Sequence, residues 1–399
     1  ISLSNLNDDQ MAHAKSGKWW EYEGQRALAN NSVAYKTKPE MGTFMREWMS
    51  LYDSKSGERG IFNRQSAIKQ AAKNGRRETE HDFGCNPCSE IILRPYQFCN
   101  LSEVVVRESD TVDTLKEKVR LATILGTFQA TLTNFKYLRK IWKDNTEEER
   151  LLGVSLTGIM DNNLTATAGD KLATVLELLK DTAVQTNAAM AKQLFIPQST
   201  AVTCVKPSGT VSQLTDAASG IHARHNPFYI RTVRGDNKDP LTQFLMSQGI
   251  PAEADVMKPD STTVFSFPMK SPQGAVTRMQ MNAIEQLELW LTYQRHFCEH
   301  KPSVTISVKE NEWMQVGSWV YDHFDEVSGI SFLPFSEHTY QQAPYQDIDE
   351  KEYKEFLTKM PSSVDWSLLQ EFEKEDTTSG GRELACTAGV CEIVDIEAA

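Results

Sequence analysis

The segment Gly84 to Leu101 reads GCNPCSEIILRPYQFCNL and holds three of the seven cysteines in this 399-residue chain. If its central part is extended, alternation places Asn86, Cys88 and Glu90 on one face. An amide, a thiol and a carboxylate would then converge. A thiol hydrogen is weak enough to exchange with a carbon-bound hydrogen, and a carboxylate near neutral pH can accept a proton from a hydroxyl.

A helix start is one alternative for the same residues. Asn86 would be the N-cap, Pro87 the first helical residue and Glu90 part of the first turn. The residue before a proline avoids helical geometry, however, and the following Ile-Ile-Leu run is typical of a strand. The extended interpretation is therefore favoured.

A zinc site is the second alternative. Cys85 and Cys88 form a C-x-x-C pair that Cys99 and a histidine could complete. Structural zinc usually has a second close pair of ligands, and none follows nearby in the sequence. A structural zinc-binding or thiol-binding module thus stays the competing hypothesis.

Composition sets outer limits on function. The chain is 40% hydrophobic and 24% charged, as expected for an ordinary globular protein. Its apolar runs are shorter than the roughly 18 residues of a membrane span, its odd cysteine count does not suit a secreted disulfide framework, and its net charge of -12 disfavours nucleic-acid binding. We expect a cytoplasmic protein, bound neither to a membrane nor to nucleic acid.

Helical and strand patterns alternate along the chain. Apolar spacing predicts helices at 111–144, with a Thr or an Asp available as the N-cap, and at 172–194 and 283–298. Apolar and β-branched runs predict strands at 151–156, 200–205, 263–267, 303–308 and 329–333. This alternation predicts an α/β fold. The polar, small-residue stretch from Lys374 predicts a mobile tail, and the opening ISLSNLNDDQ suggests a fragment or a processed half.

Several segments together resemble the ribonucleotide reductases, most closely the adenosylcobalamin-dependent class II enzymes. They are NPCSE at 86–90, CNLSEV at 99–104, the runs 203–234 and 329–345, and the tail cysteines Cys386 and Cys391. The resemblance extends over nearly the whole chain but covers only about the C-terminal half of a complete reductase. It implies that residues 1–373 form the C-terminal part of a ten-stranded α/β barrel and that 374–399 form a flexible redox-active tail.

The resemblance also implies roles in catalysis. Cys88, at the tip of a finger loop inside the barrel, would become the thiyl radical that abstracts the 3′ hydrogen of a ribonucleotide. Glu90 would be the base on the 3′ hydroxyl, and Asn86 would hydrogen-bond the ribose. Cys99 would be one of the two thiols that reduce the 2′ carbon. Cys204 and Cys298, in contrast, are predicted to be small buried hydrophobic residues.

A second candidate site follows the predicted strand at 200–205. Pro207, Ser208, Gly209 and Thr210 place a glycine and hydroxyls at a strand-to-helix turn, where backbone N–H groups can bind an anion. Alone, this run is more often a plain turn. The family resemblance favours substrate phosphate binding.

Cofactor and partners follow from the resemblance as well. The run 336–342 lacks the adjacent tyrosine pair of iron-dependent reductases, so the implied radical generator is adenosylcobalamin. The implied partners are a ribonucleotide, favoured as the triphosphate, and an N-terminal half that supplies the second reducing thiol. A thioredoxin-like reductant is expected to reduce Cys386 and Cys391, which in turn reduce the Cys99 disulfide.

Overall fold

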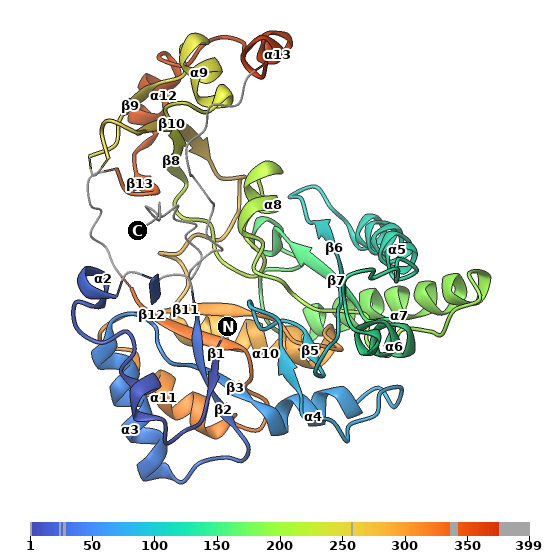
Figure 1. The fold of residues 1–399 in the computed structure, drawn as a ribbon. Coiled ribbons are helices and arrows are strands. Elements are labelled where there is room, and N and C mark those ends of the chain that lie inside the picture. Colours follow the sequence, from blue (N-terminus) through green and yellow to red (C-terminus); the bar gives the residue numbers. More distant parts are fainter. Residues whose placement is uncertain (1, 24, 27–28, 257, 336–341, 375–399) are drawn as a thin grey trace. The chain divides into compact units, whose positions relative to one another are not determined.

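The computed structural model describes residues 2–23, 25–26, 29–256, 258–335 and 342–374 (Figure 1). The chain divides into two compact units, one of residues 1–223 with 274–335 and the other of 224–273 with 336–399. Cys386 and Cys391 lie outside the described residues, as does most of the run 336–342. The predicted boundary between residues 373 and 374 therefore stays a prediction.

A five-stranded sheet forms one wall of the first unit. Its order is β1 (Ser2–Ser4), β2 (Asn31–Tyr35), β3 (Gly60–Asn63), β12 (Ile330–Pro334) and β11 (Val304–Val308). The pairs β1–β2, β2–β3 and β11–β12 are parallel, whereas β12 meets β3 antiparallel at Ile330 and Ile61. Two parallel groups of opposite direction thus meet at the β3–β12 border.

A second sheet pairs β6 (Asn100–Val105) with β7 (Leu152–Thr157) in parallel. The predicted strand at 200–205 is present only as single bridges, Val154 with Thr203 and Val205 with Pro302. These bridges connect β7 to the segment just before β11, so paired segments run continuously from β1 to β6. The α/β prediction is confirmed, and closure into a ten-stranded barrel stays a prediction.

Helices surround these strands. The longer ones are α3 (Met41–Ser54), α4 (Arg64–Ala72), α5 (Val112–Gln129), α6 (Lys140–Glu149), α7 (Asp170–Gln193), α10 (Ala283–His296) and α11 (Trp313–Asp322). Short elements are α1 (Asp9–Ala12), α2 (Trp19–Tyr22), η2 (Ile159–Asp161) and α8 (Gly209–Leu214). In Figure 1, α5, α6 and α7 lie beside β6 and β7. The helices predicted at 172–194 and 283–298 are confirmed.

The single helix predicted at 111–144 is wrong in its middle. It begins as expected, because the Thr111 side chain accepts a hydrogen bond from the Thr114 N–H in a capping box. It ends at Gln129, and residues 130–139 form turns before α6. Tertiary contacts hold this break: the Phe135 ring packs 5.1 Å from Phe98, and Arg150 donates to the Ala130 carbonyl.

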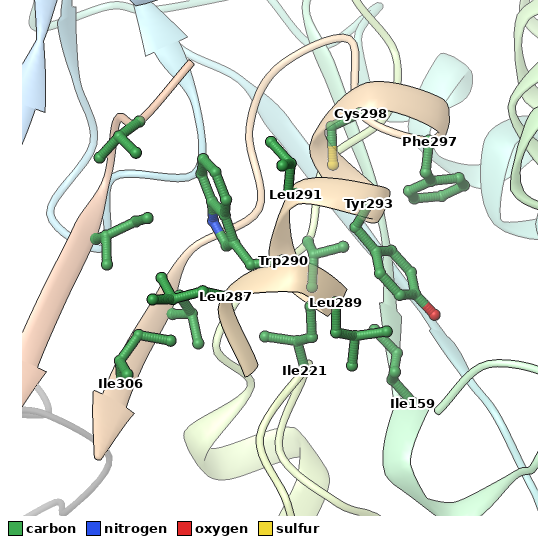
Figure 2. Packing of buried hydrophobic residues seen from close by; sticks show 14 of the residues in the cluster. Ile159, Ile221, Leu287, Leu289, Trp290, Leu291, Tyr293, Phe297, Cys298 and Ile306 are labelled. Atoms are coloured by element: carbon green, nitrogen blue, oxygen red, sulfur yellow. The ribbon is translucent and has the colours of Figure 1, made fainter. Parts of the chain in front are cut away.

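Helix α10 lies in the main hydrophobic core. Leu289, Trp290 and Leu291 are consecutive and all buried, so the helix has apolar neighbours on several sides. Figure 2 shows Leu287 beside Ile306 of β11 and Tyr293 on the side of Ile159. The polar atoms of the large rings are satisfied: Trp290 donates to the Pro302 carbonyl at 2.8 Å, and the Tyr293 hydroxyl to the Thr165 carbonyl at 3.0 Å. This packing supports the segment that precedes β11.

The second unit is an antiparallel sheet with short helices. Its strand order is β13 (Tyr345–Asp347), β8 (Phe228–Asp236), β10 (Thr262–Lys270) and β9 (Ala252–Ala254). The helical elements are α9 (Pro240–Ser247), α12 (Glu350–Leu357), η3 (Trp366–Leu368) and α13 (Leu369–Phe372). Phe244 of α9 packs against Trp366 and Phe372, which attaches the described C-terminal residues to this unit.

Candidate active site

Cys88 lies at the tip of a hairpin loop in the first unit. Strand β4 (Gly84–Cys85) pairs antiparallel with β5 (Ile92–Leu93), and residues 86–91 connect them. The Ser89 N–H donates to the Asn86 carbonyl at 2.9 Å, and Ser89 has a φ of 68°. The predicted extended run from Asn86 to Glu90 is therefore wrong, as is the helix start, because these residues form a tight turn.

The Asn86 side chain stabilises this turn. Its Oδ1 atom accepts a hydrogen bond from the Ile91 N–H at 3.0 Å, across the base of the loop. An Asn side chain that bonds the backbone close by is a common way to fix a turn. Because Oδ1 is used, the amide group of Asn86 has its N–H₂ donors left for a ligand.

Glu90 is fully buried, and the described part of the chain offers neither of its carboxylate oxygens a hydrogen-bond partner. Its backbone carbonyl accepts from the Lys301 N–H at 3.0 Å, which fixes the residue in place. The nearest cation is Lys206, whose Nζ lies 3.8 Å from Oε1. A buried carboxylate without hydrogen bonds is costly, so this side chain is arranged for something other than stability.

Both predicted reactive thiols are held in the protonated form. Burial and then the Glu90 carboxylate raise the pKa of Cys88, although Lys206 opposes them. Burial and Glu90 also raise the pKa of Cys99, against a weaker effect of Arg77. At neutral pH these side chains are S–H groups, the form that can give up a hydrogen atom.

The three loop cysteines do not form a zinc site. Cys85, Cys88 and Cys99 are all free thiols, and no group of three or more metal-binding side chains occurs among the described residues. Thiols with raised pKa values are also poor zinc ligands, since zinc binds the thiolate. The zinc alternative is not supported. Cys204 and Cys298 are buried, as predicted.

A network of buried polar groups holds the segment between Cys88 and Cys99. Arg77 donates two hydrogen bonds to Glu149, at 3.0 and 2.9 Å, and a third to the Ile92 carbonyl. Gln97 donates to Glu149 and accepts from the Arg94 N–H. These hydrogen bonds fix where β5 ends and where the chain turns toward Cys99.

Lys301 contacts the Cys88 loop through the side chain of Ser89. Its ammonium is fully buried, 3.3 Å from Ser89 Oγ, 3.4 Å from Ser328 Oγ and 4.4 Å from the Phe62 ring centroid. Burial lowers the pKa of Lys301 to about 8, and the electrostatic effects of Cys85 and Glu90 partly offset it. Lys301 is thus a second basic residue, after Lys206, next to the turn that carries Cys88.

Comparison with known proteins gives this geometry a context. No family model matches the chain. The adenosylcobalamin-dependent ribonucleoside-triphosphate reductase of Euglena gracilis is 28% identical over 78% of this chain and 43% of its own length. The protein of the same name from Lacticaseibacillus paracasei is 26% identical over 98% of this chain and 56% of its own length. The chain is similar in sequence to these reductases.

Solved structures agree on the fold. A B12-dependent class II ribonucleotide reductase matches 92% of this chain and 55% of its own chain, with a TM-score of 0.74 and 24% identity. A class Id reductase α subunit from Actinobacillus ureae matches 77% of this chain with a TM-score of 0.51 and 13% identity. The chain has the fold of part of a class II reductase, and it spans about half the length of the relatives it matches.

The predicted phosphate-binding run lies at the start of a short helix. Gly209 begins α8, Thr210 is exposed, and Ser208 precedes them without capping the helix through its side chain. The Ser208 hydroxyl instead donates to Glu103 Oε2 at 2.8 Å. The helix after this run is present, but the segment before it forms only isolated bridges and no full strand. Phosphate binding by Pro207 to Thr210 stays a prediction.

Three charged residues near Glu90 were missed by sequence reasoning. Lys206 directly precedes the Pro207–Thr210 run, and Glu103 is part of the CNLSEV segment, so both had a sequence signal. Burial raises the pKa of Glu103, which Ser208 and Lys206 partly offset. Lys301 gave no signal, because an isolated lysine before a strand reads as a surface residue.

Within the described part of the chain, no helix is both long and apolar enough to cross a bilayer.

Proposed function

We propose that this chain is the catalytic half of a ribonucleotide reductase, which converts ribonucleotides to 2′-deoxyribonucleotides through a thiyl radical. The observation that carries this proposal is the Glu90 carboxylate: it is fully buried, without a hydrogen-bond partner in the described residues, two positions from the Cys88 thiol at the loop tip. Such a carboxylate is suited to receive a hydroxyl of a bound ligand.

The proposed reaction assigns each group one step. Cys88, once it has lost its hydrogen atom, takes the 3′ hydrogen of the ribose, while Glu90 accepts the 3′ hydroxyl proton. The 2′ hydroxyl leaves as water. Cys99 and a second thiol together become a disulfide; they provide two electrons, the proton that completes the water and the hydrogen that C2′ gains. Cys88 then returns its hydrogen to C3′, and Glu90 returns its proton to the 3′ oxygen. Asn86 donates its amide N–H to the ribose.

The radical generator proposed is adenosylcobalamin, as the names of the relatives state for those proteins. When bound, this cofactor supplies the chemistry that removes a hydrogen atom from a thiol. The described residues fit this demand, because Cys88 is partly exposed at the loop tip and remains protonated. An ionised thiolate would have no hydrogen atom to give.

Substrate and partners are proposals of the same kind. We favour a ribonucleoside triphosphate, with Pro207, Ser208, Gly209 and Thr210 near its phosphates. The second reducing thiol would come from a complementary half, because the relatives are about twice as long as this chain. The tail thiols Cys386 and Cys391 would carry electrons from a thioredoxin-like reductant, and the cytoplasm stays the predicted location.

The direct test is product formation by the chain combined with its complementary half, adenosylcobalamin and a dithiol. Deoxyribonucleotide is measured by chromatography, and omission of each component is the control. Cofactor-dependent product supports the proposal. Failure to form product with a complement that binds the chain and supplies the second thiol would contradict it.

Two cysteine variants separate the reducing steps. Cys99→Ser is expected to block product while still permitting the first hydrogen abstraction. Changing Cys386 and Cys391 together to serine should leave one turnover intact but stop turnover driven by thioredoxin, and a small dithiol should restore it. Full thioredoxin-driven turnover by the double variant would rule out the tail as an electron carrier.

A further inference from the structure

A buried ion pair joins Glu90 to Lys206. The two charged atoms are 3.8 Å apart, which is ion-pair range but beyond a hydrogen bond. The Glu90 side chain is fully buried, and 33% of the Lys206 side chain is exposed. Lys206 therefore reaches from the protein surface toward the carboxylate without using up either oxygen's capacity to accept a hydrogen bond.

Lys206 is itself held firmly. Its backbone N–H donates to Ser155 Oγ at 2.8 Å, and the next residue back, Val205, bridges Pro302. Its carbonyl lies against Gly220, where an added Cβ would come within 2.4 Å of it. The ammonium is thus carried by a segment fixed on both sides.

Charged and titratable groups from several elements face this pair. They are Cys88 and Cys99 on the loop segment, Glu103 on β6, Cys204 before α8, and Lys301 before β11. Of the two lysines, Lys206 alone among the described residues lies within ion-pair distance of the Glu90 carboxylate. The ammonium of Lys301 is instead engaged by two serine hydroxyls.

We propose that Lys206 is a positioning residue that keeps the Glu90 carboxylate ionised and directed toward the Cys88 thiol. This inference rests on the proposed function, because it takes Glu90 to be the base. A base must be ionised before its substrate arrives, and a buried carboxylate without hydrogen bonds tends to protonate. An ion pair at 3.8 Å supplies charge compensation while both oxygens remain free for a hydroxyl.

The pKa shifts of Lys206 and Cys88 have the directions that this ion pair requires. Burial lowers the pKa of Lys206, but Glu90 and then Cys88 raise it, and the net shift is upward. Lys206 is therefore charged throughout the neutral range. The same charge lowers the pKa of Cys88 against the opposing effects of burial and Glu90, so Cys88 reactivity reports on the pair.

The test measures alkylation of Cys88 by iodoacetamide from pH 6 to 10, with peptide mass spectrometry resolving it from the other cysteines. The proteins are wild type, Lys206→Met, Lys206→Arg, Glu90→Gln and the double variant Lys206→Met with Glu90→Gln. Lys118→Met is the matched control, because Lys118 has 36% exposure and pairs with the buried Asp110 elsewhere in the same unit. Thermal unfolding checks that each variant is folded.

Glu90→Gln is expected to be alkylated at Cys88 about threefold or more faster than the wild type at neutral pH. Removing the Glu90 charge lowers the pKa of Cys88, and a full pKa unit changes the thiolate fraction about tenfold. In the Lys206→Met background the same change should have little effect, since Glu90 is already protonated there. Lys206→Arg should behave as wild type, and Lys118→Met should change nothing.

An equal effect of Glu90→Gln in both backgrounds would overturn the proposal, because Glu90 would then be ionised without Lys206. The measurement needs no cofactor, nucleotide or complementary half. Its outcome is therefore independent of whether the chain proves to be a reductase.

Discussion

Two buried glutamates of the first unit have opposite surroundings. Glu149 receives two hydrogen bonds from Arg77 and one from Gln97, and although burial raises its pKa, these partners lower it overall. Glu90 is also buried, but its carboxylate has one ion pair at 3.8 Å and no hydrogen bond in the described residues. A fully satisfied carboxylate holds structure together, whereas an unsatisfied one marks the place for a ligand.

The largest expected effect is at the satisfied glutamate. Arg77→Met leaves the Glu149 charge buried without its main partner, and we expect the free energy of unfolding to fall by about 3–5 kcal/mol. Urea denaturation followed by circular dichroism measures it. Arg120→Met, which breaks an exposed pair with Glu117, is the control and should show no clear change. If Arg77→Met and Arg120→Met were equally stable, the Arg77–Glu149 network would not stabilise the fold.

A pH-dependent effect is expected from Lys301. Its pKa is about 8 in the folded chain against 10.5 when exposed, so between these values the unfolded chain binds more protons and stability rises with pH. The cost of charging Lys301 in the fold, about 3 kcal/mol, is present below pH 8 and disappears as the pH rises toward 10.5. Lys301→Met should remove this slope in urea titrations. An unchanged slope would show that burial does not lower the pKa of Lys301 in the folded chain.

The Cys88 turn depends on a close contact with Gly329. Gly329 has a φ of +73°, and an added Cβ would lie 2.9 Å from the Ser89 carbonyl oxygen. We expect Gly329→Ala to lower stability by about 1–3 kcal/mol and to change Cys88 alkylation.

Gly75→Ala is the matched control for this contact. Gly75 has a similar φ of +69°, but an added Cβ there would meet nothing within 4 Å. It therefore measures the backbone strain alone. If the two variants lose the same stability and Cys88 reactivity is unchanged, the contact with Ser89 does not support the loop.

The smallest stability effect is expected at the unsatisfied glutamate. Glu90→Gln removes a buried charge that makes no hydrogen bond in the described residues and whose ion-pair partner Lys206 is partly exposed, so the free energy of unfolding should stay within about 1 kcal/mol or rise slightly. Glu149→Gln, measured by the same urea titration, should be clearly destabilising. Similar losses for both would mean that Glu90 is also a structural residue.

The sequence predicted the residues of the loop better than its shape. Cys88, Glu90 and Asn86 are adjacent in one short motif, so their types and order are legible without a structure. Their conformation is not, because the turn depends on Asn86 bonding Ile91 and on Lys301 and Gly329 beneath Ser89. The support from Lys301 and Gly329 comes from segments more than 200 positions away from Ser89, and no local sequence pattern indicates it.

The same distinction applies to secondary structure. The Thr111 cap and the apolar spacing of 172–194 and 283–298 are local signals, and these helices are present. The break at 130–139 contains neither proline nor glycine and depends on Phe98 and Arg150, which pack against it from other segments. Likewise, Lys206 is beside Glu90 only because the chain returns there through the bridges at Thr203 and Val205.

The most direct test of the central claim compares two cysteines three positions apart on one hairpin. In the enzyme assembled with its complementary half and adenosylcobalamin, Cys88→Ser should abolish deoxyribonucleotide formation, because serine holds its hydrogen too strongly to replace the thiol. Cys85→Ser, at the base of the same hairpin, should retain most of the activity. Normal product formation by Cys88→Ser would contradict the account.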